Sequence, residues 1–313
     1  MKGIDLARLY YEAYGKPMLE REFSDILRYL AVGLVGSGSE RFGYDDEVSQ
    51  DHDFEPGFCI FIPGEDVVDT RTEFRLKRAY DKLPREFMGF KRAIDAPVGG
   101  ARNGVMRTAD FYGERVGSHT GELTTAEWLA IPDSYLAEAT NGKIFFDGYG
   151  EFTKIRERLL VMPEDVRLKR LAGNIMVMAQ SGQYNYSRCL SHGEPEAAQL
   201  ALNNFVDGAA RVFFLLEKKY MPFYKWAFRA MREAGGKNHA DRLAALLTGD
   251  IYDRAVQAAR ADAVEGIAKE VIKRLKDQGL TEEDGSDLER HAYAVNDKIR
   301  DGGLRNANIF AAV

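Results

Sequence analysis

Two short groups of residues near the start of the chain have types and spacing that suit phosphate and metal chemistry. Gly38-Ser39 forms a small-residue turn, and Asp51 and Asp53 follow after eleven intervening residues. The backbone N–H groups of such a turn, with the Ser39 hydroxyl, suit a phosphate. Asp51 and Asp53 at the start of a strand point to one side, because side chains alternate with period two. Two oxygen ligands on one side can share Mg²⁺, and metal plus phosphate cradle is the minimal equipment for phosphoryl or nucleotidyl transfer.

Two apolar segments are expected to position these groups. The segment from residue 31, AVGLVGSG, predicts a short buried strand that ends in glycines, and FCIFIP at 58–63 predicts a second strand. Apolar residues at helical spacing predict helices over residues 4–14 and about 18–31. A further helix is expected from about Asp66 to Lys82.

The secondary-structure patterns of the rest of the chain change near residue 150. Residues 91–121 are rich in turn signals and are expected to contain two strands, whereas GKIFFDG predicts a strand between glycines. After about residue 150 strand signals vanish and long helical patterns follow. We therefore predict an α+β fold: a mixed sheet with flanking helices over residues 1–152, and an all-helical domain over 153–313.

Other readings of the motif fail on single positions. Arg41 stands where a dinucleotide-binding GxGxxG loop needs its third glycine, and the chain has no GxxxxGK[ST] phosphate loop. DHDFEPG resembles the opening of a calcium loop, but Pro56 and Ile62 occupy the glycine and bidentate glutamate positions. One alternative without a functional site stays open. Seven carboxylates fall between Glu40 and Glu55, and a run of charge is usually a solvated loop.

Composition indicates a soluble cytoplasmic protein. The 313 residues are 45% hydrophobic and 29% charged, which is ordinary for a globular chain. No apolar run approaches the roughly 20 residues that a membrane-spanning helix needs, so no membrane partner is expected. The net charge of −6 disfavours nucleic acid as a partner. The two cysteines, Cys59 and Cys189, have no zinc-site spacing and are expected to be reduced thiols.

The stretch GSGSERFGYDDEVSQDHDF resembles the signature of the nucleotidyltransferase superfamily. That signature is Gly-Ser, a glycine four residues on, and then Ser-x-Asp-x-Asp, which here are Gly38-Ser39, Gly43 and Ser49-Gln50-Asp51-His52-Asp53. The superfamily includes the aminoglycoside and lincosamide nucleotidyltransferases. The longer stretch also looks like a bacterial family of unknown function with this N-terminal domain, and that likeness extends through AEATNGKIFFDGYGEFTKIRERL and LLEKKYMPFYKWAFRAM.

The resemblance implies roles for the matching residues. Asp51 and Asp53 would ligate Mg²⁺ (or Mn²⁺) as the catalytic carboxylates, and Gly38 and Ser39 would hold the β- and γ-phosphates of a nucleoside triphosphate. Ser49 is a further candidate for nucleotide binding. In related enzymes a lysine of the helical domain reaches the triphosphate, and Lys225 is the candidate here. Gln183, Tyr184, Asn185, Tyr186 and Arg188 would either line the acceptor cleft or satisfy one another between helices.

The chain departs from the family where a third carboxylate is expected on a later strand. We predict that strand around ERVGSHTG, residues 114–121, where Gly117, Ser118 or His119 holds the expected position. Glu114, Glu122 or Asp147 could substitute, and Asp147 reads equally well as a turn residue before Gly148. Loss of the third acid would put catalysis in doubt while leaving nucleotide binding intact.

The function that these features predict is Mg²⁺-dependent transfer of a nucleoside monophosphate, AMP above all, from ATP or another nucleoside triphosphate to an acceptor hydroxyl. The site is expected in the cleft between the two domains. The acceptor would be a small molecule or a protein, and neither the base nor the oligomeric state can be read from the sequence. The alternative is a catalytically impaired nucleotide-binding regulatory protein. A third possibility is a helical scaffold whose acidic loop is merely solvated.

Overall fold

The computed structural model describes residues 1–48, 54–92 and 102–313, and these divide into two compact units. The first unit is Met1–Thr124 with Tyr135–Val161, and the second is Thr125–Ser134 with Met162–Val313. The predicted boundary at residue 152 falls inside helix α8 (Glu151–Leu160) of the first unit. The chain passes from one unit to the other three times, because residues 125–134 belong to the second unit.

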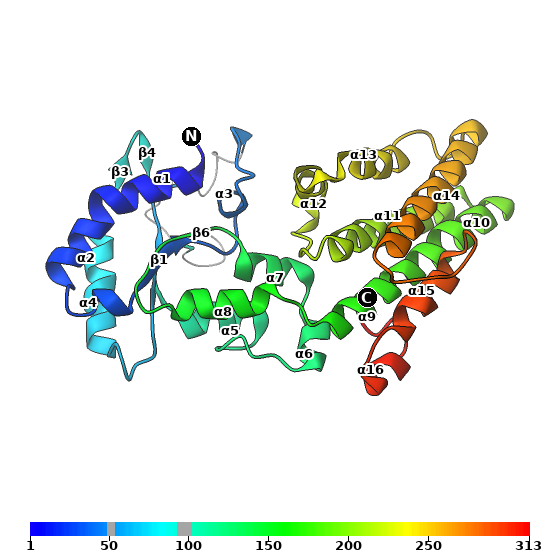
Figure 1. Cartoon of the computed structure of the whole chain (residues 1–313). Helices are drawn as coiled ribbons and strands as arrows, with labels where there is room; N and C mark the ends of the chain where they lie inside the picture. The colour runs from blue at the N-terminus through cyan, green and yellow to red at the C-terminus, as the bar shows by residue number, and fades with distance from the viewer. Residues whose placement is uncertain (49–53, 93–101) are drawn as a thin grey trace. The chain divides into compact units, whose positions relative to one another are not determined.

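The first unit is built on a mixed four-stranded sheet of order β5-β2-β1-β6 (Figure 1). Its strands are β1 (Ala31–Leu34), β2 (Cys59–Ile62), β5 (Gly104–Arg107) and β6 (Lys143–Asp147). β1 pairs antiparallel with β2 and β6, and β2 pairs parallel with β5. A separate hairpin joins β3 (Glu86–Phe87) and β4 (Phe90–Lys91). The predicted strands at 31, 58–63 and 143–147 are confirmed.

Helices cover both faces of this sheet (Figure 1). They are α1 (Gly3–Tyr10), η1 (Tyr11–Gly15), α2 (Lys16–Glu22), η2 (Leu27–Tyr29), α3 (Ser39–Phe42), α4 (Thr70–Asp81), α5 (Thr108–Val116) and α8. On one face Tyr10 and Tyr80, from α1 and α4, pack on Phe58 before β2. On the other face Phe111 of α5 and Phe152 of α8 pack on Phe61 of β2. The core of the first unit is therefore two aromatic layers with the sheet between them.

Two predicted helices differ in extent from those in the structure. The helix predicted over 18–31 ends at Glu22, because the chain turns at Phe23 and resumes as β1. Its apolar residues are buried around the turn. Their three- and four-residue spacing therefore indicated buried positions but not a continuous helix. The helix predicted from Asp66 begins at Thr70, where the Asp69 side chain accepts a hydrogen bond from the Thr72 N–H at 2.7 Å and caps the helix.

The second unit consists of helices and turns only in residues 162–313, all of which are described, so the predicted α+β fold class is confirmed. Its helices are α6 (Thr125–Ala130), α9 (Glu164–Met178), η4 (Ala179–Tyr186), α10 (Ser187–Ser191), α11 (Pro195–Leu216), α12 (Tyr224–Met231), η5 (Arg232–Gly236), α13 (Lys237–Leu246), α14 (Arg254–Asp277), α15 (Leu288–Asp297) and α16 (Gly302–Asn306). α7 (Asp133–Thr140) starts in this unit and ends in the first. α9 is the central helix and packs against α11 and α15.

One buried arginine fixes residues 125–134 to the second unit. Arg170 of α9 pairs with Asp133 and donates hydrogen bonds to the carbonyl oxygens of Trp128 at 2.7 Å and Ile131 at 2.5 Å. Both members of the ion pair are buried, and the two terminal nitrogens of the guanidinium make their contacts with this short segment. Burial raises the pKa of Asp133, and the charge of Arg170 opposes that rise.

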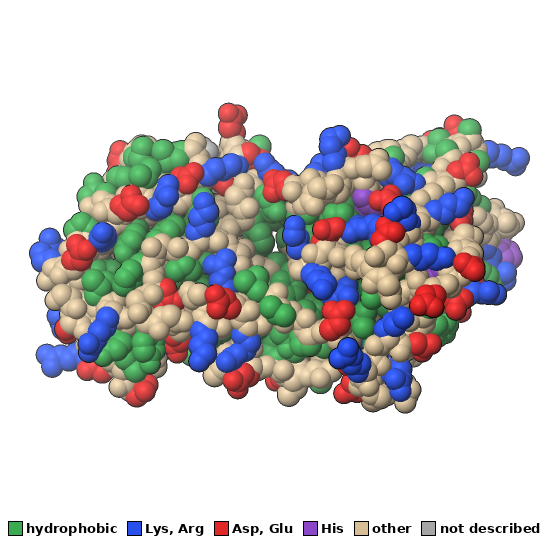
Figure 2. All heavy atoms as spheres, viewed as in Figure 1, with side chains coloured by type: hydrophobic (Ala, Val, Ile, Leu, Met, Phe, Trp, Pro, Cys, Tyr) green, Lys and Arg blue, Asp and Glu red, His purple; other side chains and the backbone are tan. Residues whose placement is uncertain are grey.

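Charge on the surface is mixed in sign. Figure 2 shows Lys and Arg side chains interspersed with Asp and Glu over the face in view, without a broad field of one sign. This agrees with the small negative net charge of the chain. Across the described residues, each helix is either too short or too polar to cross a bilayer.

Candidate functional site

The loops that the sequence motifs predicted to be important lie together at one end of the strands of the sheet. We call this end of the sheet its edge. The pairing of Gly33 with Cys59 places the end of β1 beside the beginning of β2. Cys59 is in turn opposite Gly104, so β5 begins at the same edge. Leu34 pairs with Lys143, which brings the beginning of β6 there as well. The turn after β1 and the segments that precede three other strands therefore meet at one edge.

The turn after β1 is held by side chains from a distant part of the chain. Asn141, which precedes β6, accepts a hydrogen bond from the Gly36 N–H at 2.8 Å and donates one to the Gly36 carbonyl oxygen at 2.7 Å. The Ser37 hydroxyl donates to Glu138 Oε2 at 2.6 Å. Gly36 and Gly38 have φ values of +101° and +131°, which favour glycine. The turn is thus fixed in place by contacts outside the motif.

Arg41 lies at this edge of the sheet and is buried. Its Nε donates to the Val35 carbonyl oxygen at 2.9 Å, and its Nη2 donates to the Arg102 carbonyl oxygen at 3.0 Å and to Asn103 Oδ1 at 2.9 Å. A fourth contact is the ion pair with Glu40. Arg41 therefore links the end of β1 to the segment before β5, and contacts within the protein occupy its hydrogen-bond donors.

Glu40 covers the position that the resemblance assigns to a phosphate. A Cβ added at Gly38 would stand 2.5 Å from Glu40 Oε1 and 2.6 Å from Oε2. The carboxylate of Glu40 therefore lies against Gly38, where the family would place the β- or γ-phosphate. Like charges repel, so a phosphate in this place requires the Glu40 carboxylate to move or to be neutralised.

Residues that neighbour the two halves of the motif in sequence meet at Gly3. A Cβ at Gly3 would stand 2.5 Å from the Cβ of Glu40 and 3.1 Å from Cε2 of Phe54. Glu40 follows Ser39 in the chain and Phe54 follows Asp53. The N-terminus of α1 thus brings together the residues next to both halves. The Gly3 N–H also donates to Asp45 Oδ2 at 2.9 Å, which fixes the loop after α3 to the same point.

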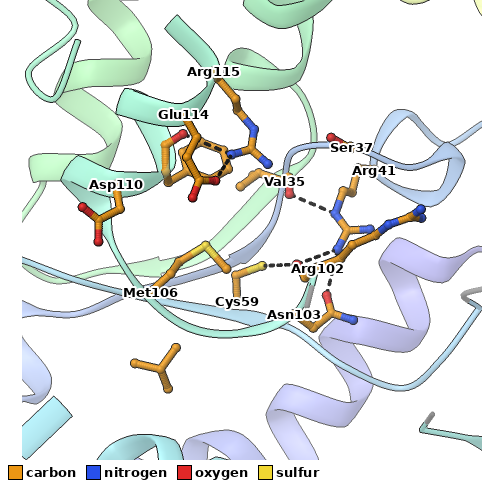
Figure 3. A pocket seen from close by; sticks show the side chains of 12 residues that line it. Val35, Ser37, Arg41, Cys59, Arg102, Asn103, Met106, Asp110, Glu114 and Arg115 are labelled. Carbon is orange, nitrogen blue, oxygen red and sulfur yellow. Dashed lines mark hydrogen bonds and ion pairs between the residues drawn. The ribbon is translucent and has the colours of Figure 1, made fainter. Parts of the chain in front are cut away.

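A cavity of about 420 Å³ opens beside this edge, between α5, the segment after β1 and the segment before β5, and we call it the α5 cavity. Figure 3 shows Asp110, Glu114 and Arg115 of α5 on one side of it and Ser37, Arg41 and Arg102 on the other. Its remaining lining is mostly apolar and includes Val35, Cys59, Val105, Met106 and Phe111. Arginines thus line both sides of the cavity, whereas Asp110 and Glu114 both belong to α5.

Burial shapes the electrostatics of the α5 cavity. It lowers the pKa of the Arg41 and Arg115 guanidinium groups, and the acids Glu138 and Glu114 oppose the change at Arg115. It raises the pKa of the Cys59 thiol, with Arg41 and Arg115 opposing. Cys59 is thus a buried thiol, and its Sγ lies 3.4 Å from the Arg102 carbonyl oxygen. Both cysteines are free, Cys59 buried and Cys189 partly exposed.

Three predicted site residues, Ser49, Asp51 and Asp53, lie outside the described residues. Their assignment as metal ligands, catalytic carboxylates and nucleotide contact stays a prediction. Within the ranges that the structure describes, His, Cys, Asp and Glu side chains form no group of three that could hold a metal ion.

The third carboxylate was predicted on a strand over residues 114–121, and this strand prediction is wrong. Residues 114–121 form the end of α5 and a turn, and β5 at 104–107 is the strand next to β2. β5 carries Gly, Val, Met and Arg in turn, so it offers no acid. The helical reading of DFYGERV was missed because Gly113 and Gly117 had suggested turns.

The acids named as substitutes have different surroundings. Asp147 pairs with Ala31 at the far edge of the sheet and accepts hydrogen bonds from the Gly150 N–H and from the Thr153 N–H and hydroxyl, at 2.7, 2.9 and 2.6 Å. It therefore ends β6 and anchors the start of α8. Glu122 is exposed and pairs with Arg158 at 3.2 Å, whereas Glu114 lines the α5 cavity.

The remaining predicted residues lie in the second unit. Lys225 is exposed on α12, and its Nζ lies 5.2 Å from the centre of the Trp226 ring. Its contact with a triphosphate stays a prediction. In the polar–aromatic group of η4, Gln183 donates to Glu265 Oε2 at 3.0 Å and to the Ser286 carbonyl oxygen at 2.8 Å, so it joins helices. Tyr184 is exposed beside Arg188.

Sequence reasoning missed several residues of this edge. No role was predicted for Arg102, Asn103, Arg115, Glu138 or Asn141, which reach the site only through the packing of the sheet and its helices. The usable signal was weak: Arg102-Asn103-Gly104 and Asn141-Gly142 each stand directly before an apolar strand pattern. A loop before a strand gains meaning only when the strand order is known.

Comparison with known proteins adds one family match. The model of a family described as a domain of unknown function (DUF4037) matches residues 128–227, from α6 to α12, which is less than half of the chain. No curated protein and no solved structure matches. The family match names no activity, and it begins after the Gly-Ser and Asp-x-Asp motifs.

Proposed function

We propose that the protein is a Mg²⁺-dependent nucleotidyltransferase that moves a nucleoside monophosphate, AMP in the expected case, from a nucleoside triphosphate to an acceptor hydroxyl. The observation that carries the proposal is the convergence on Gly3 of Glu40 and Phe54, which are the chain neighbours of Ser39 and Asp53. The family signature needs its small-residue turn and its acid pair at one place. The described neighbours of both meet at one sheet edge.

In the proposed reaction the acceptor oxygen forms a bond to the α-phosphorus as the bond from that phosphorus to pyrophosphate breaks. The acceptor loses its hydroxyl proton to a base. Magnesium, when bound, would neutralise charge on the triphosphate. The chain contributes the turn at Gly36–Ser39, which Asn141 and Glu138 hold in place before any ligand binds. A turn fixed in advance costs less free energy to order on binding.

A second candidate function follows from β5. This strand lies beside β2 where the family would carry its third acid, and it has none. That observation favours the alternative of a nucleotide-binding regulatory protein with impaired catalysis. The cytoplasmic location, the nucleoside triphosphate and a small-molecule or protein acceptor belong to the proposal in either form.

Calorimetry with ATP and Mg²⁺, together with a pyrophosphate-release assay over an acceptor panel, tests both forms. We expect binding and release by the wild-type chain and loss of both in Asp51→Asn and Asp53→Asn, with unchanged melting temperatures. Glu47→Gln is the matched control, because Glu47 is an exposed acid of the same loop. Binding without release supports the regulatory form. Equal binding and release by the wild type and both Asp variants would refute the proposal.

A further inference from the structure

The exposed side of α4 carries four positive charges in one row. Arg71, Arg75 and Arg78 stand on the helix and Lys82 follows it directly, at spacings of four, three and four residues. Because an α-helix turns about 100° and rises about 1.5 Å per residue, the four positions fall within about 60° of arc and span about 16 Å. All four residues are exposed. We call these four residues the basic stripe.

The described part of the chain gives the basic stripe no acid as an ion-pair partner. Glu73, on the same helix, is already paired with Lys77 and with Arg107, each at 2.6 Å. Like charges three or four residues apart weaken a helix. The basic stripe therefore holds an unrelieved repulsion, which a row of acids from another molecule would remove.

Two acids lie at the border of the basic stripe. Hydrogen bonds from Thr72 chiefly lower the pKa of Asp69, and the charges of Arg71 and Arg75 lower it further. Asp81 is exposed near the other end of the helix. Neither acid forms an ion pair with the stripe within the ranges that the structure describes, so both leave most of its charge uncompensated.

Aromatic rings hold two of the guanidinium groups in place. The guanidinium carbon of Arg75 lies 5.5 Å from the centre of the Phe23 ring, and that of Arg78 lies 5.9 Å from the centre of the Phe74 ring. A side chain that is already positioned loses less conformational freedom on binding. Phe74 itself is 61% exposed and offers an apolar contact beside the charges. Arginines around an exposed aromatic ring are typical of the residues that contribute most to a protein interface.

Spacing and charge favour a helix of another protein over a membrane or a nucleic acid. Neighbouring members of the basic stripe are about 4.5–6 Å apart along the axis, which is the spacing of side chains three or four positions apart on any partner helix. The order four-three-four is the same in both directions, so a parallel or an antiparallel helix fits. The one exposed aromatic ring of α4 is too little apolar surface to enter a membrane. The net charge of −6 and the bordering acids oppose a long polyanion.

We propose that the basic stripe binds an acidic helix of a partner protein, with four Asp or Glu side chains facing the four cations and an apolar side chain against Phe74. One helix face buries little area, so the complex is weak and reversible. Its charges lie close to solvent, so added salt weakens it. The interaction needs neither nucleotide nor metal, and it does not rest on the proposed function.

Fluorescence anisotropy with a labelled synthetic peptide tests the proposal. The striped peptide is an alanine-rich helix with glutamates at i, i+4, i+7 and i+11 and one leucine beside them. The redistributed peptide has the same composition, with the four glutamates spread around the helix. We expect the full chain to bind the striped peptide in the micromolar range at low salt, and the redistributed peptide about tenfold more weakly. Physiological salt should weaken binding of the striped peptide.

Reversal of charge in the basic stripe should remove most of this binding. Arg71→Glu with Arg75→Glu is expected to weaken the striped peptide by about tenfold or more, and Phe74→Ala by about threefold. The matched control is Arg254→Glu with Arg300→Glu, because both arginines are exposed in the second unit and the net charge changes equally. The control should change the affinity by less than about twofold.

Melting temperatures show whether each variant folds, and Arg78→Gln with Lys82→Gln tests the stripe if the first pair unfolds. Three results would overturn the proposal: no binding of the striped peptide at millimolar concentration, equal affinity for the two peptides, or equal losses in the stripe and control variants. Binding of a single-stranded oligothymidylate as tightly as the striped peptide would overturn it in favour of nucleic acid. Failure here leaves nucleotide transfer untouched, because calorimetry with ATP and Mg²⁺ measures that separately.

Discussion

The side chain of Asn141 brackets the Gly36 peptide, accepting from its N–H at 2.8 Å and donating to its carbonyl oxygen at 2.7 Å. These residues are 105 positions apart, so the pair joins the start of β6 to the turn after β1. Asn141→Ala removes both bonds and leaves two backbone groups partly buried. We expect a loss of about 1–3 kcal/mol in unfolding free energy, measured by urea denaturation.

The same variant should also weaken ATP about tenfold if the turn holds phosphate, since a loosened turn must be ordered on binding. Asn204→Ala, at an exposed position of α11, is the control. Unchanged ATP affinity in a destabilised Asn141→Ala protein would place the phosphates elsewhere.

Glu40→Gln tests what the carboxylate over Gly38 does. The change keeps the size of the side chain and removes its negative charge. If a phosphate binds at Gly38, we expect ATP to bind more tightly by about tenfold, because one repulsion is removed. Titration of ATP with Mg²⁺ into both proteins measures this. A loss of binding would instead mark Glu40 as the acid that completes the metal site.

Gly3→Ala tests the convergence of the two motif halves. The added methyl group would stand 2.5 Å from the Glu40 Cβ, so either α1 or α3 must shift. We expect a cost of about 1–3 kcal/mol in stability and weaker nucleotide binding. Gly302→Ala is the control, because a Cβ there meets open space. Full nucleotide affinity in Gly3→Ala would show that Gly3 is irrelevant to the site.

His239 should make the second unit sensitive to acid. Burial lowers its pKa, and Glu270, 3.4 Å from its Nδ1, opposes this. Arg242 and Arg274 also lie near, and Arg242 donates to Glu270 at 2.9 Å. Below about pH 6.5 the unfolded chain takes up a proton more readily than the folded one, so stability falls as pH drops through that value.

Urea midpoints at pH 7.5 and 5.5 measure the effect of this histidine. His239→Gln should be less stable at the higher pH, because it loses the stack on Phe213, but should lose less on acidification. Parallel pH dependence in the two proteins would assign the acid sensitivity to other groups.

Arg170→Met should be the most damaging substitution in the second unit. It leaves Asp133 buried without its main partner and frees two buried carbonyl oxygens. We expect a loss of about 3–5 kcal/mol in unfolding free energy. Arg211→Met is the matched control, since Arg211 lies 3.9 Å from Asp133 and is partly exposed; its cost should stay below about 1 kcal/mol. Equal costs would contradict the assignment of Arg170 as the anchor.

The sequence predicted the sheet better than it predicted the site. The strands at 31–34, 59–62 and 143–147 were visible as apolar segments between turn residues, because burial and turn chemistry act locally. The strand at 104–107 was not placed, since GVMR has no apolar alternation. Without the position of this strand, Arg102 could not be predicted to lie at the edge of the sheet. The third acid was therefore predicted in residues 114–121, which begin inside helix α5.

The site residues Arg115 and Asn141 show the limit of motif reading. Each acts through a contact with the Gly36 turn or its surroundings, and nothing in their local sequence marks such a contact. Gly38, by contrast, was predicted to lie in a turn from its residue type, and its positive φ value explains why glycine stands there. Local backbone demands can be read from a sequence, whereas partners that are far apart along it need the strand order.

The threefold passage of the chain between its two units limits how the protein can be divided. A fragment that stops at Thr124 lacks β6, so β1 would lose one of its two neighbours and Gly36 would lose Asn141. A fragment that starts at Met162 leaves Arg170 without the backbone oxygens it binds. Neither half is therefore a freely exchangeable module, and recombination between relatives would have to swap both segments of a unit together to keep it intact.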